Sequence, residues 1–386
     1  MIENRIIHIC EDEKFINSSI EQFEFCFPNK NEFYVFKKDI FSDFIHVKPQ
    51  IFVKKTTKEE LVELTQTISP QAIIVLHSLS NNFYDFVLHL HKSNKIIWFC
   101  FGFEVYNDSN YFKSKALLDK ITRVQFPDKK RSLGQKIKER LKPYYRLLKS
   151  SFPLSAKEKK NKVMLRINYL GSSFKEEFLK VSKLIGQKKL FFDFWYYPLE
   201  LIVDVNKNIY YPKKNILIGN SGFKTGNHLD VFAAIKNYNL VSNKIIVPLN
   251  YGIKEYINTV VAEGEQCFSE KYYPFLEFVS LQEYNAVLEE VGVAILNNKR
   301  QQAVGNTIGL LWLGAKVFLN KENPFYHYLK RIGIIVFCYQ TELNEKSCNE
   351  YLSLEQIEVN RSILFTHLNR EKLAAELKQQ INNINA

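Results

Sequence analysis

The chain has 386 residues, more than one hydrophobic core usually holds, and its 46% hydrophobic content is enough for two domains. The N-terminus is too polar for a signal peptide and no apolar run reaches about 18 residues, so we expect a protein that is neither secreted nor membrane-spanning. The net charge of +12 is concentrated between Lys113 and Lys162, where 17 Lys and Arg stand against four acids, which favours a polyanionic partner.

Short apolar strands alternate with helices in the first half, a pattern typical of a parallel α/β layer. Strands are expected at residues 5–9, 32–36, 71–76, 95–101, 163–167 and 190–196, and helices at residues 15–27, 58–67, 83–91 and 174–185. His77 and Glu104 each follow a strand, so both are placed at the ligand-facing edge of the sheet, where either could accept a proton from a hydroxyl group. The structural alternatives are a hydrogen-bonded imidazole and a carboxylate at a helix start.

The segment 134–149 has apolar residues at mostly four-residue spacing, among them Leu141, and basic residues on its other faces. The basic residues that we expect to face a membrane are Lys136, Lys138, Arg140 and Lys142. An amphipathic, Lys/Arg-rich helix of this kind is suited to a membrane interface, although a helix facing the core with a solvated basic side is the commoner case. Nucleic acid would use the same charge, but no helix-turn-helix, zinc or RNP-like signature is present.

Residues 197–212 are irregular and form the candidate crossing between two domains. The second half then has expected strands at 215–218, 244–249, 276–280, 291–296, 316–319 and 333–338, and expected helices at 229–238 and 370–384. After the first of these strands, small residues between Gly219 and Gly226 would let the backbone approach a phosphate group. This loop matches neither G-x-G-x-x-G nor a Walker sequence.

The unit at 291–319 organises the second half. A strand, a polar loop, one helix ending at Gly314 and a second strand form a βαβ unit, which implies parallel pairing. Its loop lies at the carboxyl end of the first strand and contains Arg300, Gln301, Gln302, Gly305 and Asn306. A cation, two amides and a helix N-terminus suit a phosphorylated, hydroxyl-rich ligand, whereas the alternative is a solvated loop with a helix cap.

Three segments carry a resemblance to a known family: 216–228 (ILIGNSGFKTGNH), 245–252 (IIVPLNYG) and 300–325, which contains RQQAVG and NKENPF. They resemble glycosyltransferase family 56, the 4-acetamido-4,6-dideoxygalactose (Fuc4NAc) transferases of enterobacterial common antigen synthesis. The strand with His8, the His77 loop, residues 98–106 and the basic stretch 138–149 fall in matching order. The chain departs from the family at Phe101 and Glu104, where Trp and Asp are usual, and at Ala303 and Asn306, which replace Gly and Thr.

The resemblance implies a GT-B fold, in which two Rossmann-like domains face each other across a cleft. It implies transfer of a sugar such as Fuc4NAc or fucose from a nucleotide donor, expected to be dTDP-linked, to a polyprenyl-diphosphate-linked glycan. The reaction would take place at the cytoplasmic face of the bacterial inner membrane, with the enzyme bound peripherally. No metal or other cofactor is implied.

Residues and resemblance together predict an acceptor-binding and membrane-facing domain at 1–196. A nucleotide-sugar-binding domain with a closing C-terminal helix is predicted at 197–386. Glu104 or His77 would act as the base, and Arg300 would neutralise the leaving group. The donor nucleotide and its diphosphate are expected to contact Gly219, Asn220, Ser221, Gly222, Tyr251, Arg300, Gln301, Gln302, Gly305, Asn306, Thr307, Asn320 and Asn323.

Two other classes of function stay open at this point. Two Rossmann-like halves also suit a nucleotide-dependent oxidoreductase or epimerase, but residues 9–13 lack the G-x-G-x-x-G that such enzymes carry after their first strand. A non-enzymatic basic protein that binds membrane or nucleic acid is the second alternative.

Overall fold

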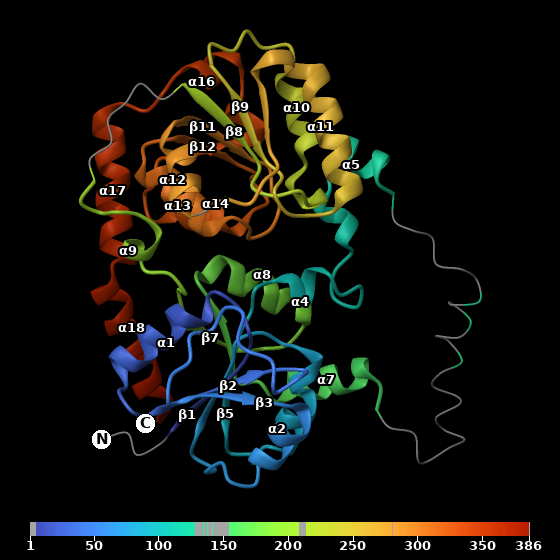
Figure 1. Cartoon of the computed structure of the whole chain (residues 1–386), viewed down its shortest axis with the longest axis vertical. Helices are drawn as coiled ribbons and strands as arrows, with labels where there is room; N and C mark the ends of the chain where they lie inside the picture. The colour runs from blue at the N-terminus through green and yellow to red at the C-terminus, as the bar shows by residue number, and fades with distance from the viewer. Residues whose placement is uncertain are drawn as a thin grey trace.

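The computed structural model describes residues 5–127, 154–207, 214–279 and 281–385, together with residues 134, 137 and 141. Its strands form one sheet of seven and one of six, and each strand pair within the described ranges is parallel. Figure 1 shows the two sheets as separate layers, one above the other, each flanked by helices. The predicted parallel α/β architecture in both halves is therefore confirmed.

In spatial order, the first sheet consists of β3 (Val53–Thr56), β2 (Asn31–Phe36), β1 (Ile6–Glu11), β4 (Ile73–Leu76), β5 (Lys95–Phe99), β6 (Tyr169–Ser172) and β7 (Leu190–Asp193). The second sheet consists of β10 (Tyr272–Phe275), β9 (Ile245–Pro248), β8 (Asn215–Ile218), β11 (Val291–Leu296), β12 (Lys316–Leu319) and β13 (Phe337–Cys338).

The helices of the first half are α1 (Ile16–Cys26), α2 (Lys58–Leu64), α3 (Tyr84–His89), α4 (Phe103–Tyr106), α5 (Lys120–Gln125), α7 (Ala156–Arg166) and α8 (Lys175–Ile185). Those of the second half are α9 (Leu199–Ile202), α10 (His228–Ile235), α11 (Lys254–Phe268), α12 (Leu281–Glu289), α13 (Val304–Trp312), α14 (Pro324–Arg331), α15 (Tyr339–Glu342), α16 (Glu345–Asn349), α17 (Leu354–Leu368) and α18 (Arg370–Asn385).

The central strands of the second sheet are short apolar runs. β8, β11 and β12 are buried along their whole length, as expected for parallel strands covered by helices on both faces. Helix α13 connects β11 to β12 and buries Leu310 and Leu311 completely. Ala294 pairs with Val317, so the predicted βαβ unit is confirmed with the predicted strand bounds.

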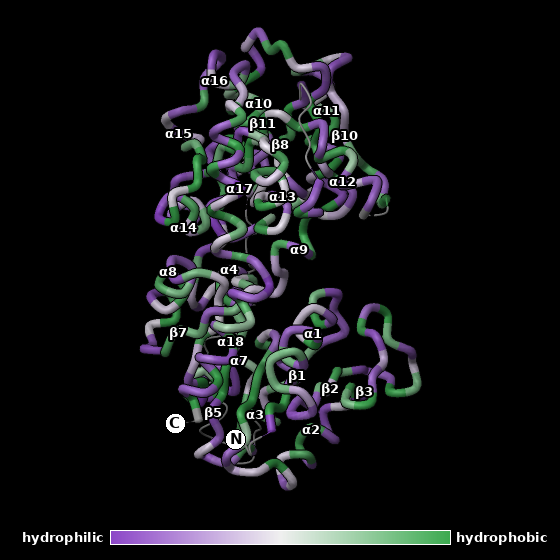
Figure 2. Tube along the Cα trace, turned by 90° about the vertical axis from the view of Figure 1, so that its left-hand side faces the viewer, coloured by the Kyte–Doolittle hydropathy of each residue, from purple (hydrophilic) through white to green (hydrophobic). Residues whose placement is uncertain are grey.

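Two segments cross from one layer to the other. Helix α18 packs against the first layer, where Leu377 and Ile381 share an apolar cluster with Phe23, and Figures 1 and 2 show it beside α1. In the opposite direction, the start of α5 is bound to the second layer because the Asp230 carboxylate of α10 accepts the N–H groups of residues 121 and 122. A division at residue 196 thus separates the strands of the two sheets, while one helix from each side lies on the other layer.

The strand predicted at 163–167 is wrong, because these residues end helix α7 and the strand begins at Tyr169. Ser155 and Glu158 form a capping box that starts the helix, and Val163 and Met164 face the core from its last turns. A short apolar run of this kind has the same pattern in a buried helix turn as in a strand.

The strand predicted at 276–280 is also wrong, since β10 occupies Tyr272–Phe275 and pairs with β9. β10 contains Pro274 and is an edge strand, where a residue without an N–H group is tolerated. The strand predicted at 333–338 is shortened to Phe337–Cys338. The helix predicted at 134–149 lies outside the described residues except at positions 134, 137 and 141.

Candidate active site

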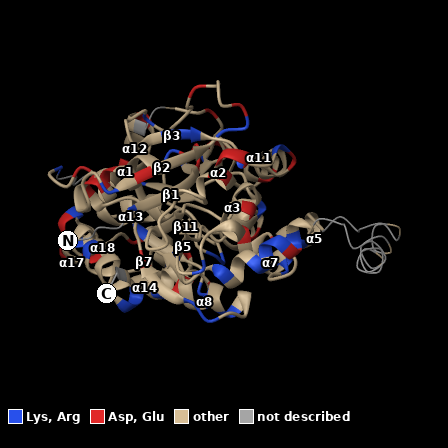
Figure 3. Ribbon diagram, turned by 90° about the horizontal axis from the view of Figure 1, so that it is seen from below, with Lys and Arg blue, Asp and Glu red and all other residues tan. Residues whose placement is uncertain are grey.

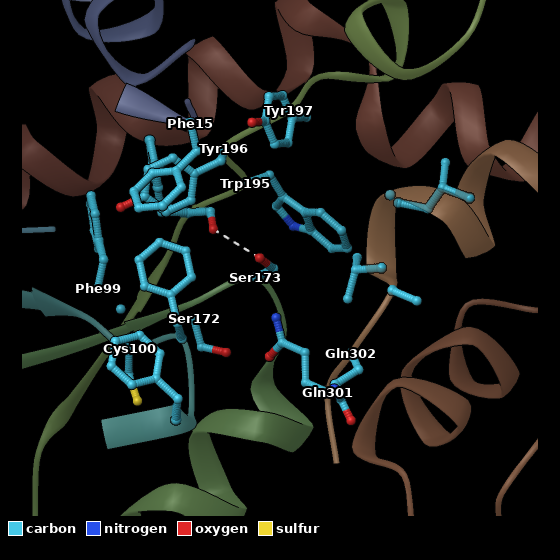
Figure 4. A pocket seen from close by; sticks show the side chains of 18 of the residues that line it. Phe15, Phe99, Cys100, Ser172, Ser173, Trp195, Tyr196, Tyr197, Gln301 and Gln302 are labelled. Carbon is cyan, nitrogen blue, oxygen red and sulfur yellow. Dashed lines mark hydrogen bonds between the residues drawn. The ribbon is translucent and has the colours of Figure 1, made fainter. Parts of the chain in front are cut away.

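A cavity of about 390 Å³ lies between the two layers. The first layer contributes residues that end or follow β5, β6 and β7, and the second contributes the loop after β11 and the first turns of α13. Figure 4 shows aromatic side chains of the first layer on one side and Gln301 and Gln302 on the other. The lining residues are Phe15, Phe99, Cys100, Phe101, Phe103, Gly171, Ser172, Ser173, Phe194, Trp195, Tyr196, Tyr197, Ile202, Arg300, Gln301, Gln302, Ala303, Val304, Gly305 and Ile308.

The N-terminus of α13 opens onto this cavity. The first N–H group bonded inside the helix is that of Thr307, which donates to the Ala303 carbonyl at 2.8 Å. The N–H groups of Val304, Gly305 and Asn306 therefore have no partner within the helix. Together with the helix dipole, they favour an anion at this end of the cavity.

Ala303 has an unusual backbone conformation directly before α13. Its φ of 54° lies in the left-handed region, which residues with a side chain rarely adopt. The strained residue directly precedes α13 and lines the cavity. Backbone strain of this kind concentrates at functional sites, where the surrounding structure holds it in place.

Arg300 brings a positive charge to the same end of the cavity. Its Nη1 donates to the Gln301 carbonyl at 3.1 Å, while its Nε has no hydrogen-bond partner among the described residues. The guanidinium carbon lies 5.9 Å from the centre of the Tyr106 ring. Burial lowers the pKa of Arg300, and the nearby Glu177 carboxylate opposes that shift. Arg300 thus has N–H donors available for a ligand in the cavity.

The glycine loop after β8 lies beside the loop after β11, as predicted. Asn298 joins them, because its Nδ2 donates to the Thr225 carbonyl at 3.2 Å and to Gln302 Oε1 at 3.0 Å. Asn220 and Ser221 are buried in this loop. None of residues 219–222 is among the described residues that line the cavity. The two loops therefore share one edge of the sheet, but only the Arg300 loop reaches the cavity.

Two glycines of this loop are required by a buried histidine. A Cβ atom at Gly219 would lie 2.1 Å from His228 Nε2, and one at Gly226 would lie 2.5 Å from the same ring. His228 is fully buried, its Nδ1 is 3.1 Å from the Tyr256 hydroxyl, and burial lowers its pKa to about 4. The sequence suggested close approach of a phosphate as the reason for these glycines, whereas internal packing already accounts for them.

Several predicted donor-binding residues have their side chains bonded within the protein. Asn320 Nδ2 donates to another asparagine at 2.6 Å, and the Asn323 side chain caps α14 at 3.0 Å. The Thr307 hydroxyl donates to a carbonyl of its own helix, and Asn306 Nδ2 is 3.0 Å from a tyrosine hydroxyl on α12. Tyr251 follows β9 and is 44% exposed. These five residues stay predicted contacts, and none of them lines the cavity.

Glu104 lies in α4, one side chain away from the cavity. Its carboxylate is next to the Leu79 N–H and to Trp98 Nε1, at 3.4 Å each, and burial raises its pKa. Cys100 lines the cavity, and its Sγ is 4.0 Å from Glu104 Oε2. A role as base would therefore require the acceptor hydroxyl to reach past Cys100.

His77 contacts the cavity wall through Tyr196 and Phe99. The Asn31 side chain donates both amide protons elsewhere, so its oxygen accepts the Nε2–H of His8 at 3.2 Å. His8 Nδ1 must then accept from His77 Nε2 at 3.0 Å, which leaves His77 Nδ1 to accept from the Tyr196 hydroxyl at 2.8 Å. Burial lowers the pKa of both histidines, so both are neutral. This series of hydrogen bonds fixes the Tyr196 ring in the wall of the cavity.

The predicted membrane contacts are mostly beyond what the structure describes. Lys136, Lys138, Arg140 and Lys142 lie outside the described residues, and Leu141 has 47% of its surface exposed. Figure 3 shows Lys and Arg residues on helix α7, which follows this segment in the sequence. Two of them are already paired, since Lys159 binds Asp85 and Lys160 binds Asp108.

Sequence reasoning missed the aromatic wall and the acid beside Arg300. The run 194–197 was interpreted as the end of a strand and the start of a crossing, yet all four of its aromatic residues line the cavity. Its position directly after β7, at the carboxyl edge, was a usable signal. Glu177 had no such signal, because an acid in the first turn of a helix is common. Within the described residues, no group of His, Cys, Asp or Glu has an arrangement that could hold a metal ion.

A family profile described as "4-alpha-L-fucosyltransferase glycosyl transferase group 56" matches residues 177–376, more than half of the chain. The chain belongs to glycosyltransferase group 56. The family that the sequence suggested is thereby confirmed, and this group 56 protein is a sugar-transferring enzyme. The matched range contains Arg300, α13 and Glu177.

Solved structures show that this group 56 protein has the GT-B fold, as predicted. An alpha,alpha-trehalose-phosphate synthase from Burkholderia xenovorans, in complex with glucose-6-phosphate, is similar with a TM-score of 0.57 and 10% identity, covering 99% of this chain and 100% of that one. A structure described as trehalose-6-phosphate from E. coli bound with UDP-2-fluoro glucose has a TM-score of 0.59 and 8% identity, covering 98% of this chain and 99% of that one. A Thermobaculum terrenum O-GlcNAc transferase mutant has a TM-score of 0.57 and 10% identity, covering 99% and 68%.

Proposed function

We propose that this glycosyltransferase moves a deoxy or acetamido-deoxy sugar, such as Fuc4NAc or fucose, from a dTDP-linked donor to a lipid-linked glycan, without a metal ion. In this reaction the bond between the sugar and the diphosphate breaks, and its electron pair stays on the leaving diphosphate. The acceptor hydroxyl oxygen forms the new glycosidic bond and loses its proton to a base. The protein therefore has to stabilise negative charge at one end of the cavity and bind sugars at the other.

The observation that carries this proposal is the convergence of Arg300 and the α13 N-terminus on the cavity. Three backbone N–H groups without helical partners and a guanidinium group with unused donors suit the two phosphates of a nucleoside diphosphate. Because these donors are held in place before the ligand arrives, they can stabilise charge that grows on the leaving group without reorganisation.

The opposite wall suits the acceptor. It carries Phe101, Trp195 and Tyr196, together with the hydroxyl groups of Ser172 and Ser173. Ligand pockets combine apolar and aromatic walls with a few polar groups that fix orientation, and a sugar has both kinds of surface. Glu104 remains our candidate for the base, with His77 as the alternative, because both lie directly behind this wall.

We further propose that the enzyme works at the cytoplasmic face of the bacterial inner membrane as a peripheral protein. No described helix is long and apolar enough to cross a membrane. The excess of Lys and Arg between residues 113 and 162 and the exposed Leu141 support attraction to an anionic lipid surface. A lipid-linked acceptor would keep its diphosphate at that surface, so the enzyme has to hold its cavity there.

A thermal-shift panel of dTDP, UDP, GDP and NAD tests the nucleotide class first. We expect dTDP to raise Tm and NAD to have no effect, because binding to the folded state alone stabilises it. Turnover is then measured as nucleotide release from a dTDP-sugar in the presence of a polyprenyl-diphosphate-linked glycan. A shift with NAD alone, or no release with any acceptor glycan, would overturn the proposal.

A further inference from the structure

Glu177 is a buried carboxyl group next to Tyr106. It lies in the first turn of α8, is 1% exposed, and neither of its oxygens has a hydrogen-bond partner among the described residues. The Tyr106 hydroxyl lies beside it without meeting hydrogen-bond geometry, and the Tyr106 oxygen also lacks a partner in the described part of the chain. Arg300 Nε is the fourth unpartnered polar atom of this group among the described residues. Buried polar atoms are rarely left unpaired, so four together need an explanation.

These three side chains meet behind the cavity. A Cβ atom on Gly102 would lie 3.0 Å from the Tyr106 ring and 3.4 Å from Glu177 Oε1, which places the ring and the carboxylate side by side. Arg300 reaches the same ring from the second layer, at 5.9 Å, while the other two residues belong to the first layer. The cluster therefore joins the two domains at the point where Arg300 enters the cavity.

Electrostatics tie Glu177 to Arg300. Among the charged neighbours of Arg300, Glu177 does most to keep the guanidinium charged against the effect of burial. Burial raises the pKa of Glu177 to about 7, with Lys180, Tyr106 and Arg300 acting in the opposite direction. Lys180 donates to the carbonyls of residues 299 and 322, so its ammonium group is already engaged. The Cys100 thiol and the Glu104 carboxyl also face this cluster, and Lys160, which acts on the pKa of Cys100, is bound to Asp108 and to the Glu104 carbonyl.

We propose that Glu177 is a positioning residue that holds Arg300 at the cavity while the donor is absent and takes up one proton from solvent when the donor diphosphate binds Arg300. The reason is that a diphosphate brings two negative charges to the guanidinium group, and a carboxylate nearby is then disfavoured in its ionised form. Protonation removes that repulsion and leaves the full positive charge of Arg300 to the ligand. This inference rests on the proposed function of Arg300 as a diphosphate ligand.

Proton uptake makes donor affinity depend on pH. Each phosphate of a nucleotide sugar keeps a single, strongly acidic group that stays ionised near neutral pH, so the proton has to be bound by the protein. Affinity should then decrease as pH rises above 7, by at most about tenfold in Kd per pH unit for one proton. Without such uptake, Kd would be constant over this range.

The experiment is titration calorimetry with dTDP-glucose in buffers of different ionisation enthalpy, between pH 6.5 and 8.5. We expect the wild-type protein to take up a proton, Glu177→Gln to take up none, and Glu177→Asp to retain uptake. Glu176→Gln is the matched control, because Glu176 is in the same turn but pairs with Arg331 at the surface. Equal proton uptake in wild type and Glu177→Gln, or none in wild type, overturns the proposal.

A measurement without ligand separates this proposal from the proposed function. The pKa of Glu177 is raised on folding, from about 4.3 in an unfolded chain, so its contribution to stability is lost as pH rises between that value and 7. Wild-type Tm should therefore fall relative to Glu177→Gln over this range, and the fall should extend to higher pH in Arg300→Gln. If dTDP-glucose does not bind but these profiles of Tm against pH are observed, the donor assignment is wrong and the coupling of Glu177 to Arg300 stands. Identical profiles in wild type, Glu177→Gln and Arg300→Gln overturn the coupling.

Discussion

Replacing Arg300 by alanine is the most direct test of the donor site. Among the described residues the side chain makes one hydrogen bond, to the Gln301 carbonyl, and it also faces Tyr106 and Glu177. A hydrogen bond between a charged group and its partner contributes about 1.5–3 kcal/mol. For a partly buried guanidinium group that binds a diphosphate we expect a loss of about 2 kcal/mol, which is a roughly thirtyfold increase in Kd.

Titration calorimetry with dTDP and dTDP-glucose measures this loss. Arg331→Ala is a suitable control, because its side chain is 55% exposed and binds Glu176 away from the cavity. Arg300→Lys should give an intermediate Kd, since lysine keeps the charge but not the planar fork that fits phosphate. Unchanged affinity in Arg300→Ala, with a wild-type Tm, would show that the guanidinium group does not touch the donor.

Two further predictions concern the base and the membrane. Glu104→Gln keeps the size of the side chain and removes the proton acceptor, so turnover should fall on the order of a hundredfold with donor affinity retained; activity near wild type would move the role to His77 or to no side chain. Reversing the charges of Lys136, Lys138, Arg140 and Lys142 should abolish binding to anionic liposomes without affecting nucleotide binding, and wild-type binding should weaken with salt. A protein that ignores these liposomes but binds duplex DNA with a steep salt dependence would contradict the membrane proposal.

The sequence predicted the second sheet best where strands are short, apolar and bounded by turn residues. Residues 215–218, 291–296 and 316–319 are strands with the predicted bounds, because each is buried on both faces and followed by a polar loop. The same rule failed at 163–167, where an apolar pair belongs to the last turns of a helix. Hydrophobic periodicity alone does not distinguish a buried strand from a buried helix turn when the apolar run is short.

The candidate site was predictable on the side of the second layer and less so on the first. The Arg300 loop carries a local signal, because a polar loop between a buried strand and a helix is a recognisable ligand site. Glu177 and Tyr106 gain their role only from Arg300, which is distant in sequence and comes from the other layer. A cluster of that kind is set by how the two domains face each other, which no local pattern encodes.

The two glycine loops allow a last, paired prediction, because the sequence analysis assigned both to phosphate binding and the structure separates them. Gly219 has a φ of 71° and no room for a Cβ atom beside His228, so Gly219→Ala should lower Tm. A Cβ atom at Gly305 meets nothing within 4 Å, and alanine is favoured over glycine inside a helix. Gly305→Ala should therefore keep or raise Tm.

Affinity for dTDP then shows which glycine the ligand needs. The added methyl group of Gly305→Ala lies at the cavity end of α13, where the phosphates are expected, so Kd should increase although the fold is intact. Gly219→Ala should regain stability when His228→Ala is added, because the smaller side chain removes the clash. If Gly219→Ala instead keeps its Tm and loses dTDP, the loop after β8 binds the phosphate and His228 is not the reason for its glycines.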